Sequence, residues 1–119
     1  MSDGPKPIRP FAYTCPICGG AMRHGENERG PWFRCHIGHE LSAADMDAGM
    51  IAMMDRALTG ALRVLDERAL LCAQFADAAA RTENRALQAR WLDLRDEVEM
   101  KAQVVSGLLD RGWPDPSGE

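Results

Sequence analysis

The sequence predicts a mostly α-helical protein in which a small β-hairpin unit precedes an antiparallel pair of helices. Two short motifs rich in cysteine, histidine and glycine lie between residues 15 and 39. After Ser42, apolar residues recur at spacings of three and four as far as Ala80, and a second such stripe runs from Leu87 to Leu109. These stripes are typical of amphipathic helices. The expected divisions are a flexible lead at 1–10, the β unit at 11–41, the helical hairpin at 42–112 (about 42–80 and 84–111) and a tail at 113–119.

The two motifs have the spacing of zinc half-sites. They read Cys15-Pro16-Ile17-Cys18-Gly19-Gly20 and Cys35-His36-Ile37-Gly38-His39. Structural zinc takes four thiolate and imidazole ligands in a closed tetrahedral set, and the glycines permit the tight turns that aim such ligands at one point. The sequence therefore predicts a zinc ribbon, a short β-hairpin with two knuckles, holding one structural Zn²⁺ per chain. The predicted ligands are Cys15, Cys18, Cys35 and His39.

Other assignments of these residues remain open. His36 or His24 can replace His39, although the three-residue spacer after Cys35 favours His39. The cysteines can instead form disulfides, but residues 1–10 show no signal peptide, and disulfides are rare in the cytosol where we expect this protein. A redox dithiol is disfavoured because Cys18 is followed by Gly-Gly and not by a helix whose dipole would lower a thiol pKa.

Short β segments surround the two motifs. Residues 11–14 have β character, Met22 begins a strand and residues 31–34 form another. The polar stretch 24–30 is expected to be a loop between them. Trp32 and Phe33 are expected to cover the knuckles.

The helical boundaries follow from capping residues and breakers. Ser42 is the expected N-cap of the first helix, Gly60 is its weakest point and the expected site of a kink, and residues 81–84 form the reversal. Gly112 and Pro114 end the second helix. At about 1.5 Å per residue the first helix runs about 57 Å and the second about 40 Å, so the second reaches back only to about Met54.

The first turns of the long helix carry a methionine face made of Met46, Met50, Met53 and Met54. This face either packs on the ribbon or forms an adaptable docking surface, because methionine repacks around varied neighbours. Cys72, on the apolar stripe, is expected to be a buried small hydrophobe.

Charge and motif content disfavour several classes of function. The net charge is −4, with a balance of +1 in residues 1–41 and −5 in residues 42–119. Arg23, Arg29 and Arg34 are too few to predict a nucleic-acid surface, and no apolar run approaches the ~20 residues of a membrane span. The chain has neither a Gly-x-Ser-x-Gly elbow nor a phosphate-binding glycine loop. We therefore expect no enzyme activity, no small-molecule substrate and no membrane association.

Three stretches of the chain form a distinctive pattern. They are Tyr13-Thr14-Cys15-Pro16-x-Cys18-Gly19-Gly20, Phe33-Arg34-Cys35-His36-x-Gly38-His39-x-x-Ser42 and Ala61-Leu62-Arg63-Val64-Leu65-Asp66-Glu67-Arg68-Ala69. Together they resemble the C-terminal extension that follows some chemotaxis-type protein-glutamate methylesterase (CheB-type) domains in bacteria, over roughly residues 11–110. The extension often has Trp-Ala where this chain has Thr59-Gly60, and the methylesterase domain itself is absent here.

The resemblance implies an accessory role in bacterial signalling, with the zinc set at the four predicted ligands. The expected function is a non-enzymatic, zinc-stabilised, cytoplasmic protein-interaction module whose helical hairpin binds a protein partner. Two helices bury only one seam, so a homodimer forming a four-helix bundle is expected. The alternatives are a nucleic-acid-binding or transcription-associated ribbon using Arg23, Arg29 and Arg34, and a thiol or zinc redox sensor.

Overall fold

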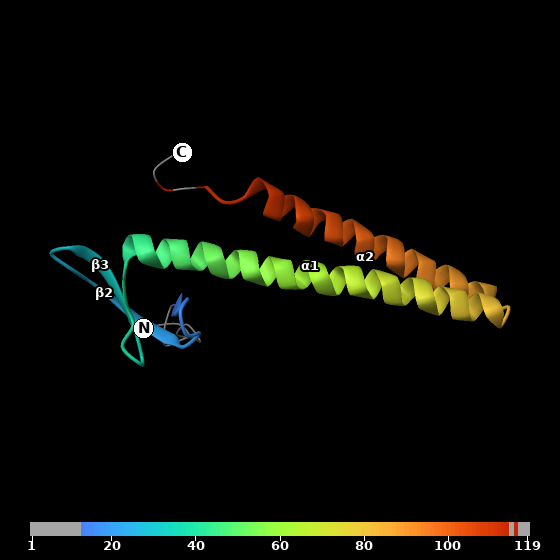
Figure 1. The fold of residues 1–119 in the computed structure, drawn as a ribbon, viewed down its shortest axis with the longest axis horizontal. Coiled ribbons are helices and arrows are strands. Elements are labelled where there is room, and N and C mark those ends of the chain that lie inside the picture. Colours follow the sequence, from blue (N-terminus) through green and yellow to red (C-terminus); the bar gives the residue numbers. More distant parts are fainter. Residues whose placement is uncertain (1–12, 115, 117–119) are drawn as a thin grey trace, which may run out of the picture. The chain divides into compact units, whose positions relative to one another are not determined.

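The computed structural model describes residues 13–114 and 116, so the expected lead at 1–10 lies outside the described residues. A small antiparallel sheet is followed by two long helices that form a hairpin (Figure 1), which confirms the predicted fold class. The chain divides into two compact units, one ending at Met53 and the other beginning at Met54. We call residues 13–53 the sheet unit and residues 54–114 the hairpin unit. The elements are β1 (Tyr13–Thr14), β2 (Ala21–Asn27), β3 (Gly30–Cys35), β4 (Glu40–Ser42), α1 (Ala43–Arg81) and α2 (Arg85–Arg111).

The sheet is a four-stranded meander, larger than the single hairpin that the sequence predicted. Its order is β1-β2-β3-β4, with every neighbouring pair antiparallel. The predicted loop at 24–30 is wrong: β2 continues to Asn27 and β3 begins at Gly30. The Asn27 side chain accepts a hydrogen bond from the Arg29 amide at 2.8 Å, so a tight turn replaces the loop.

The meander brings the two motifs to the same end of the sheet. Residues 15–20 connect β1 to β2, and residues 36–39 connect β3 to β4. Met22 of β2 pairs directly with Cys35 of β3. In a meander, the connection from β1 to β2 and the connection from β3 to β4 lie at the same end of the sheet. The two knuckles are therefore neighbours in space, although 20 residues separate Cys15 from Cys35 in the sequence.

The core of the sheet unit is very small. Its buried side chains are Cys15, Met22, Cys35 and Met46, with Phe33, Leu41 and Met50 packed against them. Met46 and Met50 thus belong to a core between the first turns of α1 and the sheet, as one of the two interpretations of the methionine face predicted. Met54 lies outside that core and is 38% exposed. Trp32 lies elsewhere: its ring sits over Gly25, so only Phe33 fulfils the expected cover of the knuckles.

Helix α1 begins where the sequence predicted. The Ser42 hydroxyl accepts a hydrogen bond from the Asp45 amide at 3.1 Å and so caps the first turn. The helix is continuous to Arg81 and does not end at Gly60, where the sequence predicted its weakest point and a kink. The tertiary packing of a long helix outweighs the weak helix propensity of a single glycine.

The reversal and the second helix also follow the predicted signals. Asn84 caps α2 by accepting a hydrogen bond from the Leu87 amide, and Gly112 ends it with a φ of 70°. The indole of Trp113 donates to the Asp55 carboxylate at 2.7 Å. The returning chain therefore reaches back to Asp55, one residue from the predicted Met54, and Trp113 at the start of the tail is hydrogen-bonded to it.

The hairpin unit buries only small side chains. Among residues 54–114, all of which the structure describes, none of the ten leucines is buried. Cys72 is buried, as predicted from its place on the apolar stripe. The buried residues of this unit are Ala69, Cys72, Ala76, Ala79, Val98 and Ala102. In the described part of the chain, neither helix is long and apolar enough to cross a membrane.

Candidate metal centre

The first knuckle is a tight loop closed by two backbone hydrogen bonds. The Cys15 amide donates to the Gly20 carbonyl and the Gly19 amide donates to the Cys15 carbonyl, both at 2.8 Å. Gly19 has a φ of 79°, which L side chains rarely adopt, so glycine is required there. Cys15 is buried and Cys18 is exposed.

The second knuckle repeats this arrangement with one residue fewer. The Cys35 amide donates to the His39 carbonyl and the Gly38 amide donates to the Cys35 carbonyl, both at 3.0 Å. Gly38 has a φ of 101°, which again requires glycine. The His39 amide also donates to the Cys35 sulfur at 3.4 Å. This turn returns the chain so that His39 and Cys35 face the same point.

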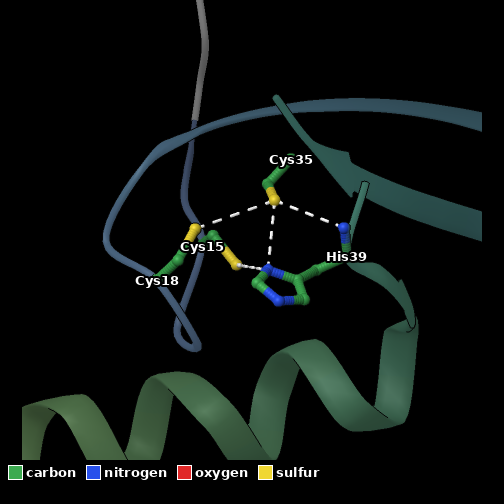
Figure 2. A group of neighbouring side chains, drawn as sticks. All are labelled: Cys15, Cys18, Cys35 and His39. Carbon is green, nitrogen blue, oxygen red and sulfur yellow. Dashed lines mark hydrogen bonds between the residues drawn. The ribbon is translucent and has the colours of Figure 1, made fainter. Parts of the chain in front are cut away.

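The four predicted ligands lie together (Figure 2). Their donor atoms are all within 4.8 Å of one another. The Sγ atoms of Cys18 and Cys35 are 3.7 Å apart, and His39 Nδ1 lies 3.2 Å from Cys35 Sγ and 3.7 Å from Cys15 Sγ. We call these residues the ligand cluster: Cys15, Cys18, Cys35 and His39.

These separations suit a tetrahedral metal ion. With metal–sulfur bonds of about 2.3 Å and metal–nitrogen bonds of about 2.0–2.1 Å, the edges of the tetrahedron are about 3.4–3.8 Å. Two of the three separations given above fall in that range, the third is slightly shorter, and the other three are at most 4.8 Å. All four cysteines of the chain are free thiols. The cluster can therefore hold a metal ion with little movement of its side chains.

The other two histidines are outside the cluster. The His24 ring stacks edge-on against Tyr13, with ring centroids 5.3 Å apart, on the sheet. The His36 ring lies against Gly20, where any Cβ would collide with it. Of the three candidate imidazoles, the structure brings only His39 to the cysteines, through its Nδ1 atom.

The electrostatics of the cluster favour a cation. Burial acts to raise the pKa of Cys35, but hydrogen bonds from the backbone amides of Ile37 and His39, and from neighbouring side chains, lower it to about 6. The Gly20 amide acts to lower the pKa of Cys18, but desolvation and the neighbouring thiols of Cys15 and Cys35 raise it. The Cys35 thiolate thus forms easily while Cys18 holds its proton more tightly, because like charges this close repel. A bound cation removes that repulsion and lets all three ionise.

Two glycines of the unit have roles that sequence reasoning missed. Gly49 lies in the second turn of α1, where Pro16 of the first knuckle packs on the helix backbone. A Cβ at Gly49 would lie 2.5 Å from Pro16 Cγ. Gly20, assigned from sequence to backbone freedom, instead makes room for His36. A glycine within an otherwise favourable helical stretch was the available signal for Gly49, since such a residue usually has a packing reason.

The arginines proposed as an alternative binding surface are only partly available. Arg34 donates to Glu40 at 2.6 Å, which offsets its charge. Arg29 and Arg34 border a hollow of about 530 Å³ beside Trp32.

The comparisons with known proteins add no assignment. The chain matches no protein family, no curated protein and no solved structure. Its function is therefore argued from its own residues.

Proposed function

We propose that the ligand cluster is a structural zinc site, and that the chain is a non-enzymatic protein-interaction module accessory to bacterial signalling. The observation that carries the zinc assignment is the convergence of three thiols and one imidazole within 4.8 Å. Soft thiolates with imidazole in a tetrahedral arrangement select zinc over hard cations such as magnesium or calcium. Four protein donors fill the coordination sphere and leave no position for a reacting water, which supports a structural role.

The small core of the sheet unit supports the same role. Two of its four buried side chains, Cys15 and Cys35, are themselves ligands. A unit of this size cannot bury enough apolar surface to fold on that basis alone. Structural zinc supplies on the order of 10 kcal/mol in small domains. Because Met46 of α1 lies in the same core, the metal also fixes the start of the long helix.

The interaction role is supported by the hairpin and by the motifs quoted above. Among the described residues, nine of the twelve exposed large apolar side chains lie in the hairpin unit. The resemblance to the extension of CheB-type methylesterases supports a place near chemosensory proteins and a cytoplasmic location. On this proposal the hairpin unit binds the partner, and the zinc-bound sheet unit fixes the start of α1.

Metal analysis tests the zinc assignment. Native mass spectrometry of the purified protein should give one zinc per chain, and Cys15→Ser should lose it. Cys72→Ala is the matched control, because Cys72 is buried in the hairpin unit and should leave the metal content unchanged. A zinc-free wild-type protein that keeps its folded sheet would contradict the proposal.

Affinity capture tests the signalling role. Zinc-loaded protein used as bait in an extract of its host should retain chemosensory or histidine-kinase proteins, as identified by mass spectrometry. The captured set should shrink when large apolar residues of the hairpin are replaced by glutamate. Capture restricted to proteins outside signalling would contradict this role while leaving the zinc assignment intact.

A second candidate, binding of single-stranded nucleic acid, is favoured by one observation. Trp32 and Arg29 border the same hollow on the sheet, and aromatic and guanidinium groups stack on bases. Binding through phosphates must weaken steeply as salt rises. A fluorescent oligonucleotide that shows no salt-sensitive binding would exclude this candidate.

A further inference from the structure

We infer that the hairpin unit is half of a four-helix bundle, and that its missing half is a second copy of this chain. This inference rests on the proposed interaction role of the hairpin and is independent of the metal. The surface through which the two copies would pair is called the flank. The flank consists of Leu71, Phe75, Leu87, Trp91 and Leu94.

The first argument is that the hairpin core is incomplete. Its buried side chains are alanines, one cysteine and one valine, whereas all ten leucines keep accessible surface. A stable helical bundle normally buries its largest apolar side chains at the centre. The two helices therefore leave part of the surface of these leucines accessible, and burying it requires a further partner.

The second argument is that large apolar groups gather on one side of the hairpin. Leu71 and Phe75 are one turn apart on α1, and Phe75 meets Trp91 of α2 with ring centroids 4.8 Å apart. Leu71, Phe75, Leu87 and Leu94 are between 37% and 46% exposed. Together they leave on the order of 300 Å² of apolar surface accessible, which is the size of a functional patch on a monomer.

The third argument is that the flank is complementary to itself. We call the end of the hairpin where α1 turns into α2 its closed end. A shallow hollow of about 390 Å³ lies there, lined by Phe75, Ala78, Ala79, Thr82, Leu87 and Trp91. Leu71 and Leu94 lie one turn further from the closed end on their respective helices. A hollow beside two projecting leucines suits a two-fold axis, because each copy then inserts its leucines into the hollow of the other.

The charges beyond the flank permit this pairing. Next along the hairpin come Arg68 of α1 and Glu97 of α2, and the Arg68 charge helps to lower the pKa of Glu97. Lys101 donates to Glu97 at 2.9 Å. We call Arg68, Glu97 and Lys101 the border of the flank. Because the border carries both positive and negative charges, a second copy meets no block of like charge. An apolar centre with a mixed polar rim is typical of protein interfaces.

The area supports a dimer of moderate size. A standard interface buries about 800 Å² on each partner. The flank supplies on the order of 300 Å² of apolar surface towards this, and the polar residues that border it supply the rim. We therefore expect a dimer that is stable at micromolar concentration.

The test compares the wild type with two matched variants by sedimentation equilibrium over micromolar to millimolar concentration. The wild type should give twice the chain mass of 13.1 kDa. Phe75→Glu should give the monomer mass. Leu70→Glu is the control, because Leu70 is 63% exposed and lies outside the flank on the same helix. It should remain dimeric.

Circular dichroism and zinc content are measured on the same samples. Leu94→Glu serves as a second flank variant if Phe75→Glu loses helicity. A monomeric wild type, a dimeric folded flank variant or equal dissociation by Leu70→Glu would each overturn the inference. A dimer without zinc would contradict the metal proposal alone, and a zinc-bound monomer would contradict the dimer alone.

Discussion

Neither the sheet unit nor the hairpin unit buries many large apolar side chains, and the two units differ in which residues occupy the buried centre. In the sheet unit, the buried centre contains two cysteines that converge with Cys18 and His39. In the hairpin unit, small side chains fill the seam and the large ones remain on the surface. On the two proposals made above, a cation completes the first unit and a second hairpin completes the other.

Metal removal should produce the largest difference between the units. Chelation by EDTA, or Cys35→Ser, should unfold the sheet unit, since structural zinc contributes on the order of 10 kcal/mol in small domains. The hairpin should retain its helices. Each unit carries its own tryptophan reporter, so NMR of the indole N–H groups should show the Trp32 signal collapse while those of Trp91 and Trp113 persist. Simultaneous loss of all three would mean that the units fold as one.

Two glycines of α1 should respond to alanine in opposite directions. Gly60→Ala should stabilise the helix by about 0.5–1 kcal/mol, because nothing lies near its Cβ position. Gly49→Ala should destabilise the sheet unit by about 1–3 kcal/mol, because the new methyl group collides with Pro16. Urea titration of the zinc-loaded proteins checks both. A stabilising Gly49→Ala would show that Pro16 does not pack on this helix.

The anchor at the open end of the hairpin should have a smaller effect. Trp113→Phe removes the hydrogen bond to Asp55 and should cost about 1 kcal/mol. Asp55→Asn keeps an oxygen acceptor and is the matched control, with a smaller loss expected. A double-mutant cycle with Asp55→Ala and Trp113→Phe measures the coupling directly. Zero coupling would show that the hydrogen bond to Asp55 does not hold Trp113 in place.

The smallest effect is expected at Glu97. The hydrogen bond from Lys101, and then its charge, hold the pKa of Glu97 below its usual range. A carboxylate with a lowered folded-state pKa stabilises the fold above its unfolded pKa, and this contribution is lost as pH falls through the folded pKa. Glu97→Gln should therefore lower the melting temperature slightly at pH 7 and by less at pH 3. An equal decrease at both pH values would exclude the ion pair as the cause.

Local signals in the sequence predicted the helical hairpin well. Ser42, the reversal ending at Asn84, and Gly112 mark helix ends through capping chemistry that acts within a few residues. The length of α2 placed its return beside residue 54 because helical rise is constant. The helix continues through Gly60 because an isolated glycine costs less than a long helix gains from packing.

The ligand cluster was also predictable, because knuckle spacing constrains the backbone locally. The remaining features depend on contacts between segments far apart in the sequence. Pairing across the sheet extends β2 and β3 through a polar stretch and adds β4. The position of Pro16 on Gly49 and the bond from Trp113 to Asp55 each join distant residues. No local pattern encodes such contacts.

X-ray absorption spectroscopy at the zinc edge tests the central claim most directly. The zinc-loaded protein should show three sulfur neighbours at about 2.3 Å and one nitrogen at about 2.0–2.1 Å. His39→Ala should remove the nitrogen, and His36→Ala should leave the spectrum unchanged, because only His39 joins the cysteines. A site with fewer than three sulfurs, or one that loses its nitrogen in His36→Ala, would contradict the account.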